Sequence, residues 1–261
     1  MPKRFFMRYN LQNGVGHFPA TAAVGAALQN AEPEEIAGYL AEFDAIQAAR
    51  AELLRARLGD ALTPLAGKRV LFLGDSNTSD NLGYRESVCR AASLVGIDAS
   101  VSGGTSSTAF GLAYTALKQA DADLVSILLG TNDAVAIGSP ELETVSLGEY
   151  ERNMRAILSW ATQTGAKVLV LAIPPIAQAG FDHYFLPQGK YQSPEHLAQY
   201  NTVLRALTEE LEIPLLTLGF LEQGEAAPSF LERDGIHLNA LGHEALAERW
   251  LTAAAQLFEN Q

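Results

Sequence analysis

Short apolar runs alternate with longer stretches of helical spacing from Lys68 to the end of the chain. Most of the apolar runs are nearly continuous in Val, Ile and Leu, as expected for parallel strands that are buried on both faces. They cover residues 69–74, 98–102, 123–130, 167–173 and 213–218. The helical stretches lie near residues 83–95, 106–120, 147–164, 194–212 and 240–257. This alternation predicts an α/β protein, a three-layer α/β/α sandwich around a five-stranded parallel sheet.

The first 66 residues depart from this alternation. Apolar residues recur there at helical spacing between Pro33, which suits the first turn of a helix, and Gly59. They are Ile36, Leu40, Phe43, Ile46 and Leu54. We therefore expect residues 1–66 to form an N-terminal helical extension and residues 67–261 to form the main domain. The apolar stripe needs a partner surface. Docking on the main domain, in a structural role, is the favoured interpretation, and dimerisation through the helix is the alternative.

The charge and the cysteine content narrow the classes of partner. The chain has 18 Lys and Arg against 30 Asp and Glu among its 261 residues, a formal net charge of −12. Such a charge repels the phosphates of nucleic acids and anionic lipid headgroups, so neither nucleic acid nor membrane is an expected partner. The single cysteine, Cys89, excludes an intrachain disulfide and a metal site built from several thiolates.

The sequence shows no pattern typical of a targeting or membrane-spanning segment. Residues 1–18 begin with basic residues but then mix Asn, Gln and Arg into the apolar positions, so they lack the continuous apolar core of a signal peptide. The longest apolar runs, such as 124–129 and 168–173, are far shorter than the ~20 residues that cross a bilayer. We expect a soluble, cytoplasmic protein.

A serine follows the first predicted strand directly, in the sequence GDSNT at residues 74–78. At the carboxyl end of a strand, Ser76 would meet the free N–H groups and the positive pole of the next helix, which suits a nucleophile. Taken alone, the same sequence is equally typical of a turn with an Asp or Ser helix cap. Thr78 stands where the G-x-S-x-G elbow of α/β-hydrolases needs glycine, so that motif does not apply.

The next two strands are followed by hydrogen-bond donors. SGGTS covers residues 102–106 after the second strand, and GTND covers residues 130–133 after the third. The backbone N–H of Gly103 can approach a substrate atom closely, and the side-chain amide of Asn132 is a further donor, as an oxyanion hole requires. Each sequence alone is more often a flexible turn or an Asx-turn.

A carboxylate and an imidazole come after the last predicted strand, in DGIHLN at residues 234–239. In a tight turn, Asp234 can accept a hydrogen bond from one ring nitrogen of His237 and leave the other free to take a serine proton. A lone D-x-x-H is weak evidence, because a surface loop often contains a histidine. The four polar clusters, in order and each at or after a strand end, favour a catalytic site.

These four blocks, in this order, resemble those of the SGNH hydrolases, also called the GDSL esterase and lipase family. The resemblance runs from about Arg69 to the C-terminus. It implies a flavodoxin-like fold and an esterase that needs no metal and no organic cofactor. It also implies specific roles: Ser76 as the nucleophile, Asp234 and His237 as the other catalytic residues, and Ser76, Gly103 and Asn132 as oxyanion donors. Asn77 stands where many members of the family have leucine or isoleucine.

The sequence favours a small ester as the substrate. Near the four blocks only Arg85, Lys190 and Arg233 are candidate cations, which disfavours coenzyme A thioesters and anionic phospholipids. A segment at 176–200 contains several aromatic residues and is expected to form a loop over the site. Its aromatic rings could stack on a sugar or an aryl group. We therefore expect hydrolysis of short acyl esters, acetyl first, of a small neutral alcohol or carbohydrate.

Three alternatives remain open at this stage. An acyltransferase would use the same residues and pass the acyl group to an acceptor alcohol. A nucleotide- or flavin-binding module would also use strand ends, but the sequence contains neither G-x-G-x-x-G nor G-x-x-x-x-G-K-[ST]. A non-catalytic ligand-binding domain would need none of the serine, aspartate and histidine chemistry. The partner in each case is a small molecule, and self-association of the chain is compatible with every one of them.

Overall fold

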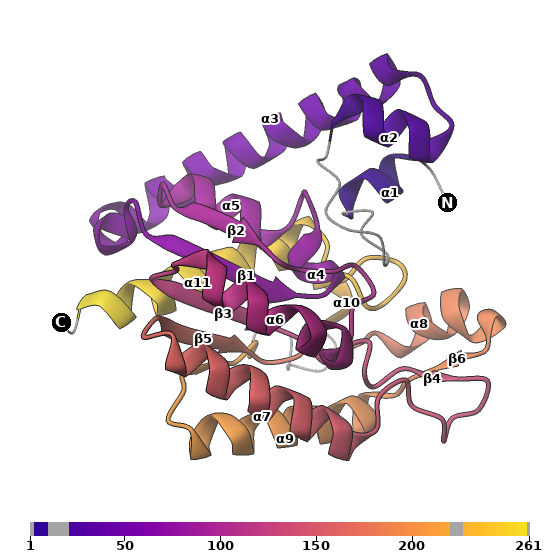
Figure 1. Ribbon diagram of the computed structural model, residues 1–261. Helices are drawn as coiled ribbons and strands as arrows, with labels where there is room; N and C mark the ends of the chain where they lie inside the picture. The colour runs from indigo at the N-terminus through magenta and orange to yellow at the C-terminus, as the bar shows by residue number, and fades with distance from the viewer. Residues whose placement is uncertain (1–2, 10–20, 220–226, 260–261) are drawn as a thin grey trace.

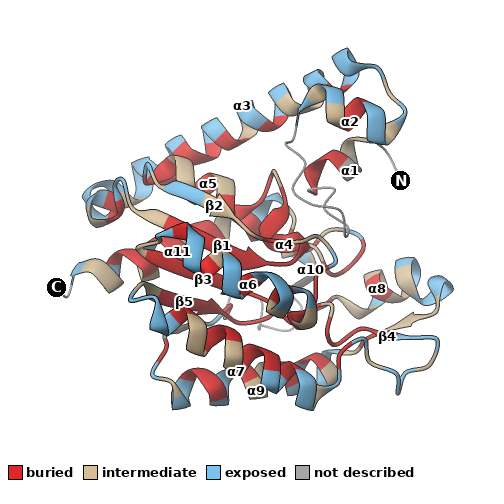
Figure 2. Cartoon of the chain, in the orientation of Figure 1, coloured by how far each residue is buried: buried red, intermediate tan, exposed pale blue. Residues whose placement is uncertain are grey.

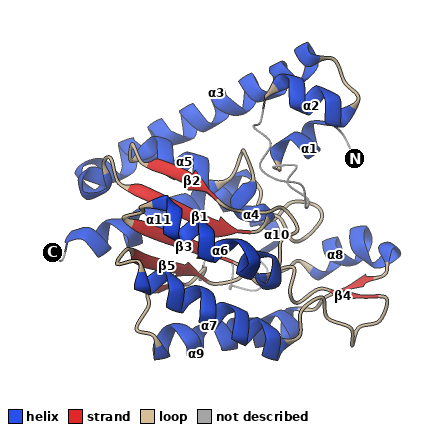
Figure 3. Cartoon of the chain, in the orientation of Figure 1, coloured by secondary structure: helices blue, strands red, loops and turns tan. Residues whose placement is uncertain are grey.

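The computed structural model describes residues 3–9, 21–219 and 227–259. Its main sheet consists of five parallel strands in the order β2-β1-β3-β5-β7 (Figures 1 and 3). The strands are β1 (Arg69–Gly74), β2 (Val95–Asp98), β3 (Leu124–Leu128), β5 (Lys167–Leu171) and β7 (Leu215–Leu216). Numbered within the sheet, this order is 2-1-3-4-5, the flavodoxin-like arrangement. The predicted fold class is therefore confirmed.

Helices cover both faces of the sheet. One layer consists of α6 (Ser106–Ala120), α7 (Leu147–Gln163) and α9 (Pro194–Glu210). The other consists of α3 (Pro33–Leu58), α5 (Tyr84–Ala91) and α11 (Ala240–Glu259). Successive residues of a strand point to opposite faces, so Leu71 and Leu73 of β1 pack in the first layer while Val70 and Phe72 pack in the second. This explains why β1 is apolar on both faces.

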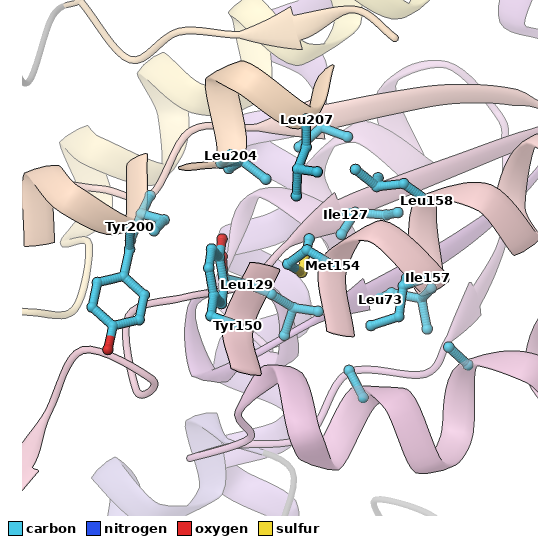
Figure 4. Packing of buried hydrophobic residues seen from close by; sticks show 14 of the residues in the cluster. Leu73, Ile127, Leu129, Tyr150, Met154, Ile157, Leu158, Tyr200, Leu204 and Leu207 are labelled. Carbon is cyan, nitrogen blue, oxygen red and sulfur yellow. The ribbon is translucent and has the colours of Figure 1, made fainter. Parts of the chain in front are cut away.

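The first of these two cores is densely filled by side chains from α7, α9 and the strands (Figure 4). Its buried polar atoms have partners: the hydroxyl of Tyr150 donates to the backbone oxygen of Leu129 at 3.1 Å. In the second core, the indole N–H of Trp250 donates to Ser126 Oγ of β3 at 2.9 Å. Such pairing removes most of the cost of burying a polar group.

The second strand lies three residues earlier than the sequence pattern predicts, at Val95–Asp98 rather than at 98–102. It is an edge strand, and Val95 is 46% exposed, so the rule of continuous apolar residues does not identify it. Beyond it, Asp98 Oδ1 accepts from the backbone N–H of Ser100 at 2.9 Å, and this local turn replaces the expected strand. The preceding helix α5 accordingly ends at Ala91 instead of near residue 95.

The sequence pattern predicts a loop at 176–200, and this prediction is wrong, because the segment contains regular structure. It forms α8 (Gln178–Phe185), the 3₁₀ turn η2 (Leu186–Gln188), β6 (Lys190–Tyr191) and the first turns of α9. β6 pairs antiparallel with β4 (Ala136–Ile137).

Three further short elements connect the main ones: α4 (Ser76–Ser79), α10 (Ala227–Phe230) and the 3₁₀ helix η1 (Gly59–Leu65).

The N-terminal part contains α1 (Lys3–Arg8), α2 (Ala22–Gln29) and α3, and its inner side is buried (Figure 2). Met7, Ile36 and Phe43 form a small apolar cluster with Leu82 of the main domain. Farther along α3, Leu54 packs in the core shared with α5 and α11. The predicted helix from Pro33 is confirmed and its stripe packs within the chain, whereas self-association stays a prediction.

The described part of the chain contains no helix that is both long enough and apolar enough to span a membrane. Of residues 1–18, which lack the pattern of a signal peptide, residues 1–2 and 10–18 lie outside the described residues. Cytoplasmic localisation therefore stays a prediction.

Candidate active site

Ser76 begins α4 immediately after β1, at the carboxyl edge of the sheet. Asp75 caps this short helix, because its Oδ1 accepts from the backbone N–H of Asn77 at 3.0 Å. Gly74 is required for the tight strand-to-helix turn: a Cβ there would lie 2.2 Å from Thr78 Oγ1. β1 and β3 are adjacent at the point where the strand order reverses, where ligands bind in open α/β sheets.

His237 joins Ser76 to Asp234. Its Nε2 lies 2.9 Å from Ser76 Oγ, and its Nδ1 lies 2.6 Å from Asp234 Oδ2. With a proton on Nδ1, the imidazole donates to Asp234 and its Nε2 is free to accept from the serine hydroxyl. The structure thus brings together the three residues that sequence analysis selected from blocks 158 positions apart (234 − 76 = 158).

A tight turn holds Asp234 in place. Asp234 Oδ1 accepts from the backbone N–H groups of Ile236 and His237, both at 3.1 Å. Burial opposes ionisation of Asp234, but the hydrogen bond and the charge of His237, together with these N–H groups, keep the pKa of its carboxyl below the usual value. Gly235 has a φ of +76°, and a Cβ there would meet the Ala177 carbonyl oxygen at 2.3 Å, so the turn requires glycine.

The predicted donors lie beside Ser76. Ser76, Gly103, Asn132 and His237 all line one pocket of about 280 Å³, the catalytic pocket. Gly103 has a φ of +73°, a left-handed conformation that glycine adopts without strain. Asn132 Nδ2 donates one hydrogen bond to the Gly104 carbonyl oxygen at 3.0 Å, which fixes the orientation of its amide. An amide nitrogen carries two hydrogens, so one is available for a ligand.

The other walls of the catalytic pocket are largely apolar. They include Val135, Ile137, Phe181, Phe185 and Ile236. The expected aromatic contribution from residues 176–200 is thus limited to two phenylalanines, because Tyr200 is fully buried in the core and Tyr191 lines a different pocket.

Lys190 also lines the catalytic pocket, and its Nζ lies 5.5 Å from the centre of the Phe185 ring. The other two candidate cations do not line it. Arg85 is buried and paired with Glu86 and Asp98, whereas Arg233 is exposed.

Two buried carboxyls lie behind the site. Burial raises the pKa of Asp75 to about 6, although the Asn77 N–H and other partners oppose this shift. Burial likewise raises the pKa of Asp133 to about 6, against hydrogen bonds from the Ser106 hydroxyl and from the Ser106 N–H, which is shared between both carboxylate oxygens. These carboxyls cap the turns that carry Ser76 and the donors, so they stabilise the site without entering the pocket.

Sequence analysis missed two residues that contact the histidine turn. Asn77 is 1% exposed, and its Oδ1 accepts from the backbone N–H of Leu238 at 2.9 Å. The signal in the sequence is that Asn77 stands where many members of the family have leucine or isoleucine. The ring of Tyr9 packs on the His237 imidazole with 4.8 Å between centroids. No spacing or motif connects residue 9 with the catalytic blocks, so the sequence carries no signal for this contact.

Within the described part of the chain, no three or more His, Cys, Asp or Glu residues are grouped so that they could hold a metal ion.

Known proteins share both the sequence pattern and the fold. A model of the GDSL-like lipase/acylhydrolase family matches residues 72–245. A curated relative, the thioesterase 1/protease 1/lysophospholipase L1 of Escherichia coli strain K12, is 26% identical over 205 residues, 75% of this chain and 86% of the relative. The lipase/acylhydrolase structure from Enterococcus faecalis has a TM-score of 0.58 at 18% identity, over 72% of this chain and 96% of that one. An acetyl xylan esterase, AlAXEase, gives a TM-score of 0.55 at 20% identity, over 70% and 98% of the two chains.

Because the family model covers most of the sequence, the chain belongs to the GDSL-like lipase/acylhydrolase family, the SGNH hydrolases. The resemblance seen in the four sequence blocks is confirmed. We therefore class the protein as an ester hydrolase.

Proposed function

We propose that the protein is a serine esterase that removes short acyl groups, acetyl first, from a small neutral alcohol or carbohydrate. One observation carries the proposal: Ser76 Oγ, His237 and Asp234 form a continuous hydrogen-bonded chain with separations of 2.9 and 2.6 Å. A serine within hydrogen-bond reach of an imidazole that a carboxylate orients is the arrangement needed for nucleophilic acyl transfer.

The reaction follows from this arrangement. His237 Nε2 takes the proton of Ser76 as Oγ attacks the ester carbonyl. The resulting oxyanion accepts hydrogen bonds from the backbone N–H groups of Ser76 and Gly103 and from Asn132 Nδ2. The imidazolium then protonates the leaving alcohol and an acyl-enzyme remains. The same imidazole deprotonates a water that attacks the acyl group, which releases the acid and regenerates Ser76.

The size and charge of the catalytic pocket support a small, uncharged ester. Its volume of about 280 Å³ is slightly below the roughly 300–1,000 Å³ usual for drug-sized ligands. Among the described residues that line the pocket, Lys190 is the one cation, a poor match for the several phosphates of coenzyme A. Phe185, which is partly exposed, offers a ring surface for a sugar or aryl group, whereas Phe181 is buried beside it. The fold similarity to an acetyl xylan esterase supports acetylated carbohydrate, whereas the Escherichia coli relative is named for thioesters and lysophospholipids.

A panel of substrates tests this proposal. We would compare kcat/KM for the acetyl, butyryl, octanoyl and palmitoyl esters of p-nitrophenol, for an acetylated xylooligosaccharide and for acetyl-coenzyme A. The proposal predicts the highest values for acetyl and butyryl esters and measurable release of acetate from the sugar. A preference for palmitoyl or for the thioester would reject the substrate class. Addition of an acceptor alcohol, with the acyl products quantified, distinguishes hydrolysis from acyl transfer.

A further inference from the structure

The N-terminal segment reaches the histidine of the active site. Tyr9 directly follows α1 and is 7% exposed. Its ring lies 4.8 Å from the His237 imidazole between centroids, at an interplanar angle of 43°. This is within the roughly 4.5–7 Å over which aromatic rings pair favourably. The family match begins at residue 72, so the contact comes from a part of the chain outside it.

Arg8 anchors this contact to both segments that carry the catalytic residues. Its guanidinium donates to Asp80 Oδ2 at 2.6 Å and to Glu232 Oε1 at 2.6 Å. Asp80 directly follows α4, the helix that begins at Ser76. Glu232 precedes Asp234 by two residues, and its backbone N–H donates to the His237 carbonyl oxygen at 2.7 Å. One side chain therefore joins the turn of the nucleophile to the turn of the base.

The anchor is buried and strongly paired. Burial opposes the charges of Arg8 and Asp80, yet their attraction raises the pKa of Arg8, and Arg8 and His243 together lower the pKa of Asp80 to about 2. Asn81 adds two hydrogen bonds to the backbone of α1. Its backbone N–H donates to the Arg8 carbonyl oxygen at 2.5 Å, and its side-chain Nδ2 donates to the Met7 carbonyl oxygen at 2.9 Å. Breaking such a buried pair is costly, so the residue that follows Arg8 is held in one place.

We infer that Tyr9 is a positioning residue for His237 and that the N-terminal segment completes the active site. This inference rests on the function proposed above and replaces the purely structural role expected from the sequence. The hydrogen bonds at Nδ1 and Nε2 lie in the plane of the imidazole and leave it free to tilt about the line between them. The ring of Tyr9 contacts the imidazole at an interplanar angle of 43°, limits that tilt and screens this side of the imidazole from water. Tyr9 is not among the residues that line the catalytic pocket, so it acts on His237 and not on the substrate.

Three variants test this role. Tyr9→Leu removes the aromatic ring and keeps an apolar side chain, whereas Tyr9→Phe keeps the ring. Met7→Ala is the matched control, because Met7 is 3% exposed in the cluster that docks α1 but belongs to neither the pocket nor the histidine contact. We would measure kcat, KM for p-nitrophenyl acetate and the melting temperature for each, alongside the wild type and Ser76→Ala.

We expect Tyr9→Leu to lower kcat by roughly 5- to 100-fold with KM within twofold of wild type. The lower bound corresponds to the energy of one lost aromatic pair, and the upper bound to the rate lost when a catalytic group is misplaced by ~1 Å. Tyr9→Phe should retain kcat, and Met7→Ala should lower the melting temperature while kcat is retained. The inference is overturned if kcat of Tyr9→Leu stays within twofold of wild type, if Tyr9→Phe loses as much, or if Met7→Ala loses as much. A wild type without esterase activity, or an active Ser76→Ala, would refute the proposed function itself and with it this role.

Discussion

Asn77 offers a sharp test of how the nucleophile and the histidine turn are held together. Its side chain bridges the two segments: Oδ1 accepts from the Leu238 N–H at 2.9 Å, and Nδ2 donates to the Ile236 carbonyl oxygen at 3.4 Å. Replacement by leucine, the residue common at this position in the family, removes both hydrogen bonds without removing much volume. The bridge spans the residue after the proposed nucleophile and both neighbours of His237.

The size of the effect follows from burial. Leu238 has no exposed surface, so water cannot replace the lost partner of its N–H. A buried donor left without a partner costs about 1–3 kcal/mol, and the longer bond to Ile236 adds little. At ~2–4 °C per kcal/mol for a domain of this size, Asn77→Leu should lower the melting temperature by roughly 2–12 °C. We also expect kcat to fall by roughly 10- to 100-fold, because a shift of ~1 Å in a catalytic group costs about 10² in rate.

The assay compares melting temperature and kcat of Asn77→Leu with those of Asn201→Leu. Asn201 makes a similar bridge, accepting from the Ile173 N–H at 2.8 Å and donating to the Ile173 carbonyl oxygen at 3.0 Å, but it lies outside the catalytic pocket. Both variants should lose stability, and only Asn77→Leu should lose most of its kcat. Equal kcat in the two variants, or unchanged stability of Asn77→Leu, would refute the reasoning.

Two further predictions concern the proposed oxyanion donor Asn132 and the buried carboxyl of Asp75. Asn132→Ala should lower kcat by about 10²–10³ with little change in KM, the usual loss for one oxyanion donor, and a rate near wild type would remove Asn132 from that role. Asp75→Asn keeps the acceptor for the Asn77 N–H and removes a carboxyl whose folded pKa is about 6. The usual value of ~3.9 is lower, so the folded protein holds that proton more tightly and wild-type stability falls as pH rises from about 4 to 6. The melting temperature of Asp75→Asn minus that of the wild type should therefore increase over that range and level off above it, whereas a difference independent of pH would contradict the raised pKa.

Elements set by burial could be predicted from the sequence. β1 begins at Arg69 and ends at Gly74, and α6 begins at Ser106 and ends at Ala120, both at the predicted residues. β1 is buried on both faces, and α6 begins at the Thr105 cap, so local pattern and packing agree. The sequence pattern predicts the second strand at 98–102, and these bounds are wrong because the edge strand β2 is only partly buried, so that its position depends on pairing with β1.

The candidate site likewise contains residues that the sequence predicts and a residue that it does not predict. Ser76, Asn132 and His237 lie in short blocks tied to strand ends, so topology alone brings them to one edge of the sheet. Tyr9 reaches His237 through a buried ion pair between residues 72 positions apart, Arg8 and Asp80, and no local pattern encodes such a pairing. Contacts of this kind become visible only once the chain is folded.

The most direct test of the central claim is covalent labelling of the nucleophile. The wild type and Ser76→Ala would be treated with a fluorophosphonate, analysed by intact mass and peptide mapping, and assayed for hydrolysis of p-nitrophenyl acetate. The account predicts one adduct on the wild type, located on Ser76, and a folded Ser76→Ala variant that is neither labelled nor active. An adduct on another residue, or substantial esterase activity in Ser76→Ala, would contradict it.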